Sequence, residues 1–232
     1  MTSILVVGTA VPIIEDNVDT DQITPGTELM RSADDSYLRW GGALFAERRY
    51  NLDGNLNPDF ILNQTEWLGA TFLLTGKNFG CGSSREWAAK AIRGYGFKAI
   101  LAESFGEIFI GNCYRHGIAP IVLSPNEIGQ LRHVALQHSP ITIDLAKQTI
   151  STSPEKKFDF KIPEMYRRML IEGIDEISFV MRFAPSVENF EKTDRLKRPW
   201  MHVTRANNGS KCYGSERDCR KHCHECSWMA AS

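Results

Sequence analysis

The sequence predicts an α/β domain built around a parallel β-sheet. From residue 69 onward, short apolar segments alternate with segments of helical periodicity. This alternation is typical of βαβ units, in which helices cover a parallel sheet. The chain has 232 residues, 42% of them hydrophobic, so it is long enough to bury a substantial core. Its 27 lysines and arginines nearly balance 28 aspartates and glutamates, which is typical of an ordinary globular protein.

The first third of the chain contains two predicted strands and a long irregular region. An apolar run predicts a strand over residues 3–14, and the turn-rich sequence EDNVDTDQITPG follows it. Residues 27–64 show little periodicity, and an irregular region of this length is more often functional than accidental. The segment GATFLLTG, residues 69–76, is a short apolar strand bounded by glycines.

The rest of the domain supplies the alternating helices and strands. The sequence SPNE is a good helix start, with Ser124 at the N-cap, Pro125 at the first helical position and Glu127 at the third. Residues 141–163 alternate apolar and polar side chains around a Ser/Pro/Lys turn, which predicts a hairpin. Predicted helices cover 84–94, 105–115, 125–137 and 164–172, the last closing at Gly173, and predicted strands cover 97–103, 118–123 and 176–183.

Composition and terminal sequence also exclude several classes of protein. No Lys or Arg precedes the N-terminal apolar run, so it is a poor secretory signal. No apolar run approaches the roughly 20 residues of a membrane span. We therefore expect a cytoplasmic protein, or one in an organelle matrix, with no membrane partner. The near-neutral charge and the lack of a basic aromatic patch argue against the alternative of an RNA-binding module.

The segment GKNFGCGSSREWAAKAI, residues 76–92, concentrates polar chemistry before a predicted helix. Ser83 and Glu86 fit the capping-box pattern, so the helix is expected to begin at or next to the serines. Gly80 and Gly82 can take positive φ and let successive N–H groups point into a concavity. A strand, a glycine-rich turn and a helix N-terminus together make an anion site.

The residues beside this turn favour a small organic acid as the anion. The spacing matches neither the P-loop nor the dinucleotide fingerprint, and the Arg85 guanidinium suits a carboxylate. A lone serine here is explained by helix capping. The pair Ser83 and Ser84 beside an arginine favours a functional role, because nest amides and a guanidinium would stabilise an alkoxide.

Three segments, in order, resemble the small subunits of 3-isopropylmalate dehydratase, which are similar to the swivelling domain of aconitase. They are NVDTDQITPG, NPDFILN and GKNFGCGSSREWAAKAIRGYGFKAILAESFGEIFIGNCYRHGIAPIVL, and the resemblance covers roughly residues 3–200. It implies a three-layer β/β/α swivelling domain over residues 1–202 that docks on a separate large subunit. The [4Fe-4S] cluster is expected on that partner, with no cofactor bound by this chain.

The resemblance also implies a reaction. The hydro-lyase would convert 2-isopropylmalate, a small dicarboxylic 2-hydroxy acid, to 3-isopropylmalate through isopropylmaleate in leucine biosynthesis, with one cluster iron as Lewis acid. The alternative is the small subunit of a related hydro-lyase, such as homoaconitase, citraconase or another substituted-malate dehydratase. Residues 27–50 should discriminate between them, because this loop is expected to contact the variable side chain of the substrate.

Carried over position by position, the resemblance assigns Ser83 as the catalytic base. Ser84 and Arg85 would hold a substrate carboxylate. The capping box instead uses Ser83 as the N-cap and leaves Ser84 freer, so the residues alone do not decide which serine is the base.

Other site residues come from earlier segments of the chain. Arg31 aligns with the basic residue of the family's substrate-recognition loop, although a surface arginine is usually solvated. Asp19 and Asp21 match an acidic turn near the site, and we expect Asp21 to orient Arg85; an Asx turn before Ile23 explains them equally well. Gly80 and Gly82 would orient the site through the glycine turn.

Six cysteines are unevenly placed, and none suggests a disulfide scaffold. Cys81 is expected to be a small buried filler rather than a cluster ligand. Cys113 and His116, three residues apart on a predicted helix, could face one way as ligands, but a packed helix explains them better.

Residues 203–232 form a Cys- and His-containing tail beyond the resemblance. We expect a disordered extension or a reading-frame artefact. The less favoured alternative is a zinc site with four soft ligands. Its ligands would be Cys212, Cys219, Cys223 and Cys226.

Overall fold

The computed structural model describes residues 5–27, 36–82 and 86–202. The chain divides into two units, residues 1–179 and 180–232. Across the described residues, no helix combines the length and the apolar character that a membrane crossing requires.

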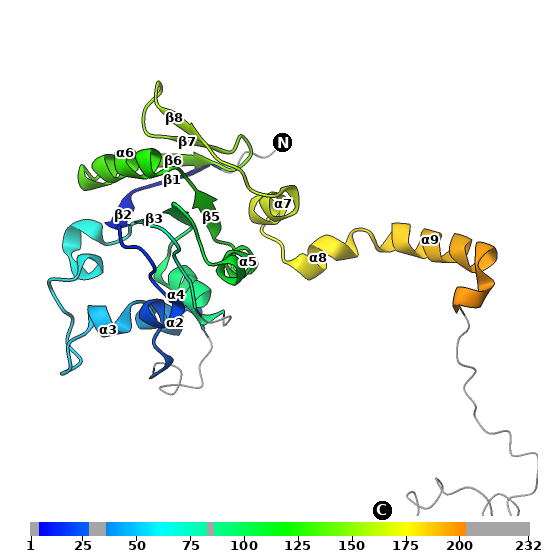
Figure 1. Ribbon diagram of the computed structural model, residues 1–232, viewed down its shortest axis with the longest axis horizontal. Helices are drawn as coiled ribbons and strands as arrows, with labels where there is room; N and C mark the ends of the chain where they lie inside the picture. Colours follow the sequence, from blue (N-terminus) through cyan, green and yellow to red (C-terminus); the bar gives the residue numbers. More distant parts are fainter. Residues whose placement is uncertain (1–4, 28–35, 83–85, 203–232) are drawn as a thin grey trace, which may run out of the picture. The chain divides into compact units, whose positions relative to one another are not determined.

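Two four-stranded sheets organise the larger unit (Figure 1). The central sheet has the order β2-β3-β4-β5 and is parallel, and the second sheet has the order β1-β6-β7-β8 and is antiparallel. The strands are β1 (Leu5–Gly8), β2 (Ala10–Ile13), β3 (Phe72–Thr75), β4 (Ala99–Ala102), β5 (Ala119–Val122), β6 (Ile141–Asp144), β7 (Thr149–Ser151) and β8 (Lys157–Asp159).

The single strand predicted over residues 3–14 is wrong, because the chain changes sheets at Thr9. β1 pairs with β6, whereas β2 pairs with β3. The Thr9 carbonyl accepts hydrogen bonds from the Thr71 and Phe72 amides, at 2.9 and 3.1 Å. A Cβ on Gly8 would overlap the Thr71 side chain, so the crossing needs glycine there. Both strands are apolar, which is why the sequence showed no break.

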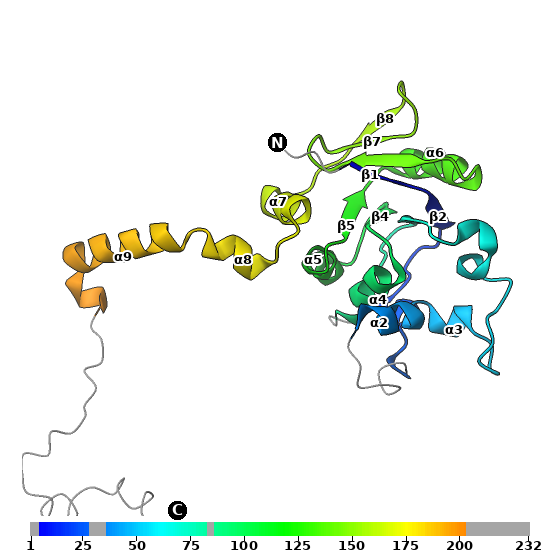
Figure 2. The ribbon, with the colours of Figure 1, turned by 180° about the vertical axis from the view of Figure 1, so that it is seen from behind.

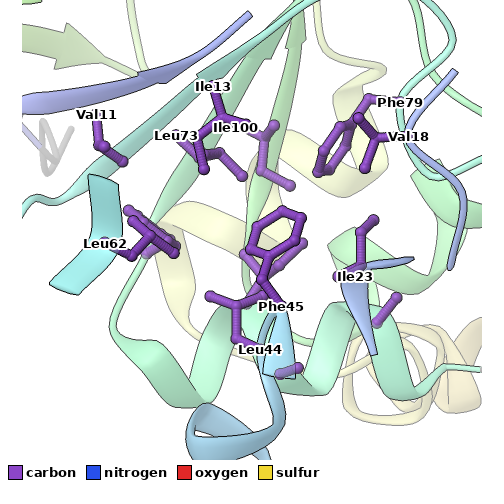
Figure 3. Close-up of a cluster of buried hydrophobic side chains, with 14 of the residues drawn as sticks. Val11, Ile13, Val18, Ile23, Leu44, Phe45, Leu62, Leu73, Phe79 and Ile100 are labelled. Atoms are coloured by element: carbon purple, nitrogen blue, oxygen red, sulfur yellow. The ribbon is translucent and has the colours of Figure 1, made fainter. Parts of the chain in front are cut away.

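The two faces of the central sheet bury different cores, as the alternation of side chains along a strand requires. Leu73 and Ile100 face the cluster drawn in Figure 3, which includes residues of α4 and α5. Phe72 and Leu74 face the other way, into a cluster shared with the second sheet and α6. Figures 1 and 2 place α2 and α4 on the side of the central sheet opposite the second sheet. This arrangement confirms the three-layer β/β/α architecture.

The helices of the larger unit largely follow the predictions. Ser124 and Glu127 form the expected capping box, and Gly173 ends α7 in the left-handed conformation, with φ 65°. The helices are α1 (Thr20–Ile23), α2 (Tyr37–Ala43), α3 (Ala46–Arg49), α4 (Trp87–Tyr95), α5 (Glu107–Arg115), α6 (Pro125–Leu136) and α7 (Glu164–Glu172), with short 3₁₀ turns η2 (Ile61–Asn63) and η3 (Thr65–Trp67). A further helix, α8 (Glu176–Met181), spans the boundary between the two units.

Three predictions of local structure need correction. The strand expected over 176–183 is a helix, α8, which begins where the Asp175 carboxylate accepts a hydrogen bond from the Ser178 amide at 2.6 Å. The region 27–64 contains α2 and α3 rather than irregular structure alone. The hairpin predicted over 141–163 is the three-stranded meander β6-β7-β8.

Helices α2 and α4 cross at very close range. A Cβ on Gly94 would lie 2.6 Å from the Gly41 nitrogen and 2.9 Å from the Tyr37 carbonyl carbon. Near the other end of the contact, the Trp40 and Trp87 rings stack with centroids 6.3 Å apart. The two helices therefore meet backbone to backbone, which only glycine allows.

The smaller unit is helical in its described part. It contains α9 (Ala184–Lys197) and the 3₁₀ turn η4 (Pro199–His202). At the end of α9, the Arg198 guanidinium donates to the Asp194 carboxylate at 2.6 Å. The sequence predicted no element here, because α9 is polar and carries only a weak apolar periodicity.

Candidate active site

Three connections meet at the carboxyl edge of the central sheet. Residues 14–19 follow β2, residues 76–82 follow β3 and residues 103–106 follow β4. In open α/β sheets this edge is the usual place for a ligand site. The glycine-rich turn expected to bind an anion is the middle connection.

Backbone hydrogen bonds hold the glycine-rich turn to the connection after β2. The Gly80 amide donates to the Val18 carbonyl at 2.7 Å, and the Thr20 amide donates to the Cys81 carbonyl at 2.9 Å. Asp19 and Cys81 thereby form a parallel bridge. The acidic turn and the glycine turn, about 60 residues apart in the sequence, therefore lie side by side.

The connection after β4 holds the other side of the turn. The Phe79 amide donates to the Ser104 carbonyl at 3.0 Å, and the Gly106 amide donates to the Phe79 carbonyl at 2.9 Å. The Asn78 amide donates to the Ser104 hydroxyl at 2.8 Å. Because bonds on both sides fix its backbone, the turn is a rigid platform.

The two glycines assigned to the turn have the positive φ that the sequence predicts. Gly80 has φ 72° and Gly82 has φ 102°. At Gly80 the space is also closed, since a Cβ would lie 2.5 and 2.7 Å from the Phe109 Cδ atoms. The Phe109 ring is 3% exposed and packs edge-on against Phe79. Gly80 thus has both a conformational and a steric reason to be glycine.

Asp19 caps helix α1 and at the same time borders the glycine turn. Its carboxylate accepts a hydrogen bond from the Gln22 amide at 2.7 Å, while the Gln22 side chain accepts from the Asp19 amide at 3.2 Å. Asp21 is exposed in the first turn of α1. The structural role of Asp19 is therefore helix capping rather than the Asx turn weighed from the sequence, in a place next to the glycine turn.

The residues expected to carry the chemistry lie outside the described part of the chain. This holds for Ser83, Ser84, Arg85 and Arg31, and for the tail cysteines Cys212, Cys219, Cys223 and Cys226. Their roles stay predictions. The described residues on either side of the serines are Gly82 and Glu86.

Glu86 departs from the predicted capping box. Helix α4 starts at Trp87, so Glu86 is at the N-cap rather than in the third helical position. Its carboxylate accepts from the Lys90 ammonium at 2.8 Å. Mainly this hydrogen bond lowers the pKa of Glu86 below its ordinary value. The glutamate and the lysine form a favourable i,i+4 pair.

A second contact of Glu86 involves His116, at the end of α5. The His116 Nε2 lies 3.3 Å from the Glu86 carboxylate, and the Tyr37 hydroxyl lies 3.0 Å from the His116 Nδ1. Burial, opposed by the Glu86 charge, lowers the pKa of His116 below its ordinary value. The sequence indicated His116 only as a possible metal ligand and gave no signal for this bridge, because its members come from three separate elements.

The described residues do not bring together a metal site. No three His, Cys, Asp or Glu side chains gather among them in a way that could hold a metal ion. Cys113 is fully buried, and burial raises the pKa of its thiol well above the ordinary value, so the packed-helix interpretation of Cys113 is supported. Cys81 is partly exposed rather than buried as expected. These side chains therefore do not fit an iron–sulfur cluster.

A cavity of about 550 Å³ borders the His116 bridge, because Tyr37 and His116 lie in its lining; its charged lining residues are Arg93, Lys98, Arg115 and Asp175. Arg93 and Arg115 occupy the last turns of α4 and α5. Cations are stabilised at helix C-termini by the helix dipole. The helix dipoles therefore account for the positions of Arg93 and Arg115.

The fold and the carboxyl-edge site define the class of the chain. A family model described as the aconitase C-terminal domain matches residues 3–126, which include the acidic turn, the glycine-rich turn and the whole central sheet. The class is that of aconitase-like domains.

Individual relatives are more specific. The 3-isopropylmalate dehydratase small subunit of Staphylococcus haemolyticus strain JCSC1435 is 43% identical over 188 residues, which are 81% of this chain and 94% of the relative. The subunit of the same name from Staphylococcus aureus strain JH9 is 44% identical over 186 residues, 80% of this chain and 94% of the relative. The chain belongs to the family of 3-isopropylmalate dehydratase small subunits.

A solved structure agrees with this family. A crystal structure of 3-isopropylmalate dehydratase from Methanocaldococcus jannaschii has a TM-score of 0.58 and 27% sequence identity, and the match covers 82% of this chain and 99% of that chain.

Proposed function

We propose that this chain is the small subunit of a 3-isopropylmalate dehydratase, a hydro-lyase that isomerises 2-isopropylmalate to 3-isopropylmalate through isopropylmaleate. The observation that carries the proposal is the 43% identity over 94% of the length of a small subunit of this name. The reaction belongs to leucine biosynthesis, and we place the enzyme in the cytoplasm.

The subunits divide the chemistry. The large subunit carries a [4Fe-4S] cluster, which supplies the Lewis acid for the departing hydroxyl group. This chain supplies the proton transfer and part of the carboxylate binding. It is active only in the complex, because it lacks the Lewis acid on its own.

Within this chain, Ser83 takes and returns the proton next to a carboxylate. A serine is too weak a base in water, so its alkoxide needs nearby donors to lower the serine pKa. Ser84 and Arg85 bind a substrate carboxylate, and Arg31 contacts the substrate from its own loop. Hydrogen bonds fix the backbone of the preceding turn as far as Cys81, which supports this assignment because Ser83 follows two residues later.

The neighbouring connections orient the site. Gly80 and Gly82 set the course of the turn with positive φ, and the bridge from Asp19 to Cys81 holds it in place. Asp21 orients Arg85. We assign residues 1–202 to the swivelling domain, with 203–232 as an extension. The alignment with the Staphylococcus haemolyticus relative covers 188 residues, more than the 179 of the larger unit. This supports a domain that extends beyond residue 179.

The test combines the purified chain with a cluster-loaded large subunit, taken from the same genome. Absorbance of the unsaturated intermediate is followed after addition of 2-isopropylmalate. Turnover that requires both chains supports the proposal. If a stable complex with an intact cluster gives none, homoaconitate and citramalate are tried next, and turnover of either would replace the proposed substrate.

A matched pair of variants tests the base. Ser83→Ala should abolish turnover while leaving the affinity for the large subunit unchanged. The control is Ser153→Ala, which removes a hydroxyl that accepts from the Lys156 amide in the β7–β8 turn. Near-normal activity of Ser83→Ala would move the assignment to Ser84.

A further inference from the structure

The bridge through His116 joins three elements that are distant in the sequence. The Tyr37 hydroxyl at the start of α2 lies 3.0 Å from Nδ1, and the Glu86 carboxylate at the start of α4 lies 3.3 Å from Nε2. The imidazole itself is at the end of α5, and its side chain is 10% exposed. One ring therefore uses both of its nitrogens to connect α2 with α4.

The hydrogen-bond partners define one protonation state of the imidazole. An ionised carboxylate can only accept a hydrogen bond, so Nε2 carries the proton and donates to Glu86. Nδ1 is then an acceptor, and the Tyr37 hydroxyl donates to it. A neutral ring satisfies both bonds with the Tyr37 hydroxyl as donor. Protonation would make Nδ1 a donor and reverse the bond, so that the Tyr37 oxygen accepts and the hydroxyl proton loses this acceptor.

The charged surroundings favour the neutral ring. Glu86 on α4 favours the protonated form, while Lys90 on α4 and Arg115 on α5 oppose it, and burial opposes it most strongly. Tyr37 is the titratable group that faces the ring from α2. Lys90 also binds Glu86, which keeps the glutamate ionised as an acceptor.

The residues of this bridge are close in sequence to residues that are proposed to contact the substrate. Glu86 directly follows Arg85 in the sequence, and Tyr37 lies six residues after Arg31. Glu86 is the first described residue after the segment with Ser83, Ser84 and Arg85, and Tyr37 is the second after the segment with Arg31. The proposed function assigns substrate contacts to both segments.

We propose that His116 is a positioning residue of the dehydratase, whose neutral imidazole fixes the starts of α2 and α4 relative to each other. This inference rests on the proposed function for its effect on catalysis. The bridge itself rests on the two hydrogen bonds.

Two substitutions of His116 each remove one of its two hydrogen bonds. In His116→Gln, the side-chain amide nitrogen can replace Nε2 and keep the bond to Glu86. In His116→Asn, the side-chain oxygen can replace Nδ1 and keep the bond from Tyr37. Tyr37→Phe removes only the hydroxyl. Each variant breaks one bond, so kcat/KM of the reconstituted complex should fall about three- to tenfold.

The pH profile separates positioning from a merely structural role. In the wild-type complex, kcat/KM should fall on the acid side as His116 takes up a proton. His116→Gln and His116→Asn cannot titrate and should lose this limb. Because Tyr37→Phe and His116→Gln break the same bond, the double variant should be no worse than His116→Gln alone. Unchanged acid limbs, or additive losses, would overturn the proposal.

A matched control and a second measurement keep the two proposals distinguishable. Tyr95→Phe also removes a hydroxyl, which donates to the Leu62 carbonyl at 2.9 Å, and it should leave the pH profile unchanged. Hydrogen exchange of the peptide spanning residues 83–92 is then measured without substrate. It should be about three- to tenfold faster in His116→Asn, which loses the bond to Glu86, than in Tyr95→Phe. Equal exchange in the two variants contradicts the bridge, whereas an inactive wild-type complex contradicts only the proposed function.

Discussion

Replacing Gly80 with alanine tests the proposed rigidity of the glycine-rich turn. Gly80 has φ 72°, and a new Cβ would lie 2.5 and 2.7 Å from the Phe109 Cδ atoms. Real Cβ atoms do not approach other heavy atoms so closely, so the ring or the turn must move. The ring has little room, because Phe109 is buried and packs against Phe79 and Phe105.

Two costs add in this variant. The left-handed conformation costs an alanine about 1–2 kcal/mol relative to its favoured conformations. Forcing a methyl group into a packed site costs about 1–3 kcal/mol more. The free energy of unfolding should therefore fall by about 2–5 kcal/mol. In a unit of this size, each kcal/mol corresponds to about 2–4 °C, so a mid-range loss would lower Tm by about 7–14 °C.

Gly54→Ala is the matched control. Gly54 has φ 84°, but a Cβ added there would have no heavy atom within 4 Å, so alanine at this position has the conformational cost alone. Thermal unfolding of both variants, followed by circular dichroism, gives the steric cost as the difference in Tm. Equal Tm values for Gly80→Ala and Gly54→Ala would refute the argument that Phe109 closes the space beside the turn.

Three further predictions concern stability. The folded-state pKa of His116 is below its ordinary 6.5, so just below pH 6.5 the unfolded chain binds more protons than the folded chain. The free energy of unfolding should therefore fall as pH drops below about 6.5. His116→Gln should reduce this pH dependence, measured by urea unfolding at several pH values. Gly94→Ala places a Cβ 2.6 Å from the Gly41 nitrogen and should lower the free energy of unfolding by at least about 2 kcal/mol. Gly129→Ala, which has open space in α6, should raise it by up to about 1 kcal/mol. Similar Tm values for the two variants would contradict this prediction. Ser124→Ala removes a helix cap and should cost about 1 kcal/mol, measured by urea unfolding, and no loss would contradict the capping role.

Local patterns predicted the parts of the fold that depend on neighbouring residues. The Ser124 capping box and the Gly173 helix end needed only a few adjacent side chains, and the structure confirms both. The central sheet followed from the βαβ alternation. α8 was assigned as a strand because its branched and aromatic residues suit a strand. The overlooked signal was Asp175, an N-cap residue, followed by the helical spacing of Ile177, Val180 and Met181.

Features that depend on distant contacts were not predictable in this way. The change of sheets at Thr9 depends on Thr71, and the bridge through His116 depends on Tyr37 and Glu86. Only a resemblance to a known family could propose roles for the serines, since their residue types also fit a helix cap. The positive φ of the glycines was predictable, because the clustering of glycine before a helix points to it.

The change of sheets at Thr9 also sets the order in which the chain can fold during synthesis. β1 pairs with β6, with Leu5 opposite Asp144, so its partner leaves the ribosome on the order of ten seconds later, at typical rates of elongation. The central sheet needs only β2 to β5 and can assemble first. Until β6 emerges, β1 is an apolar strand with free edges, the kind of segment that chaperones bind.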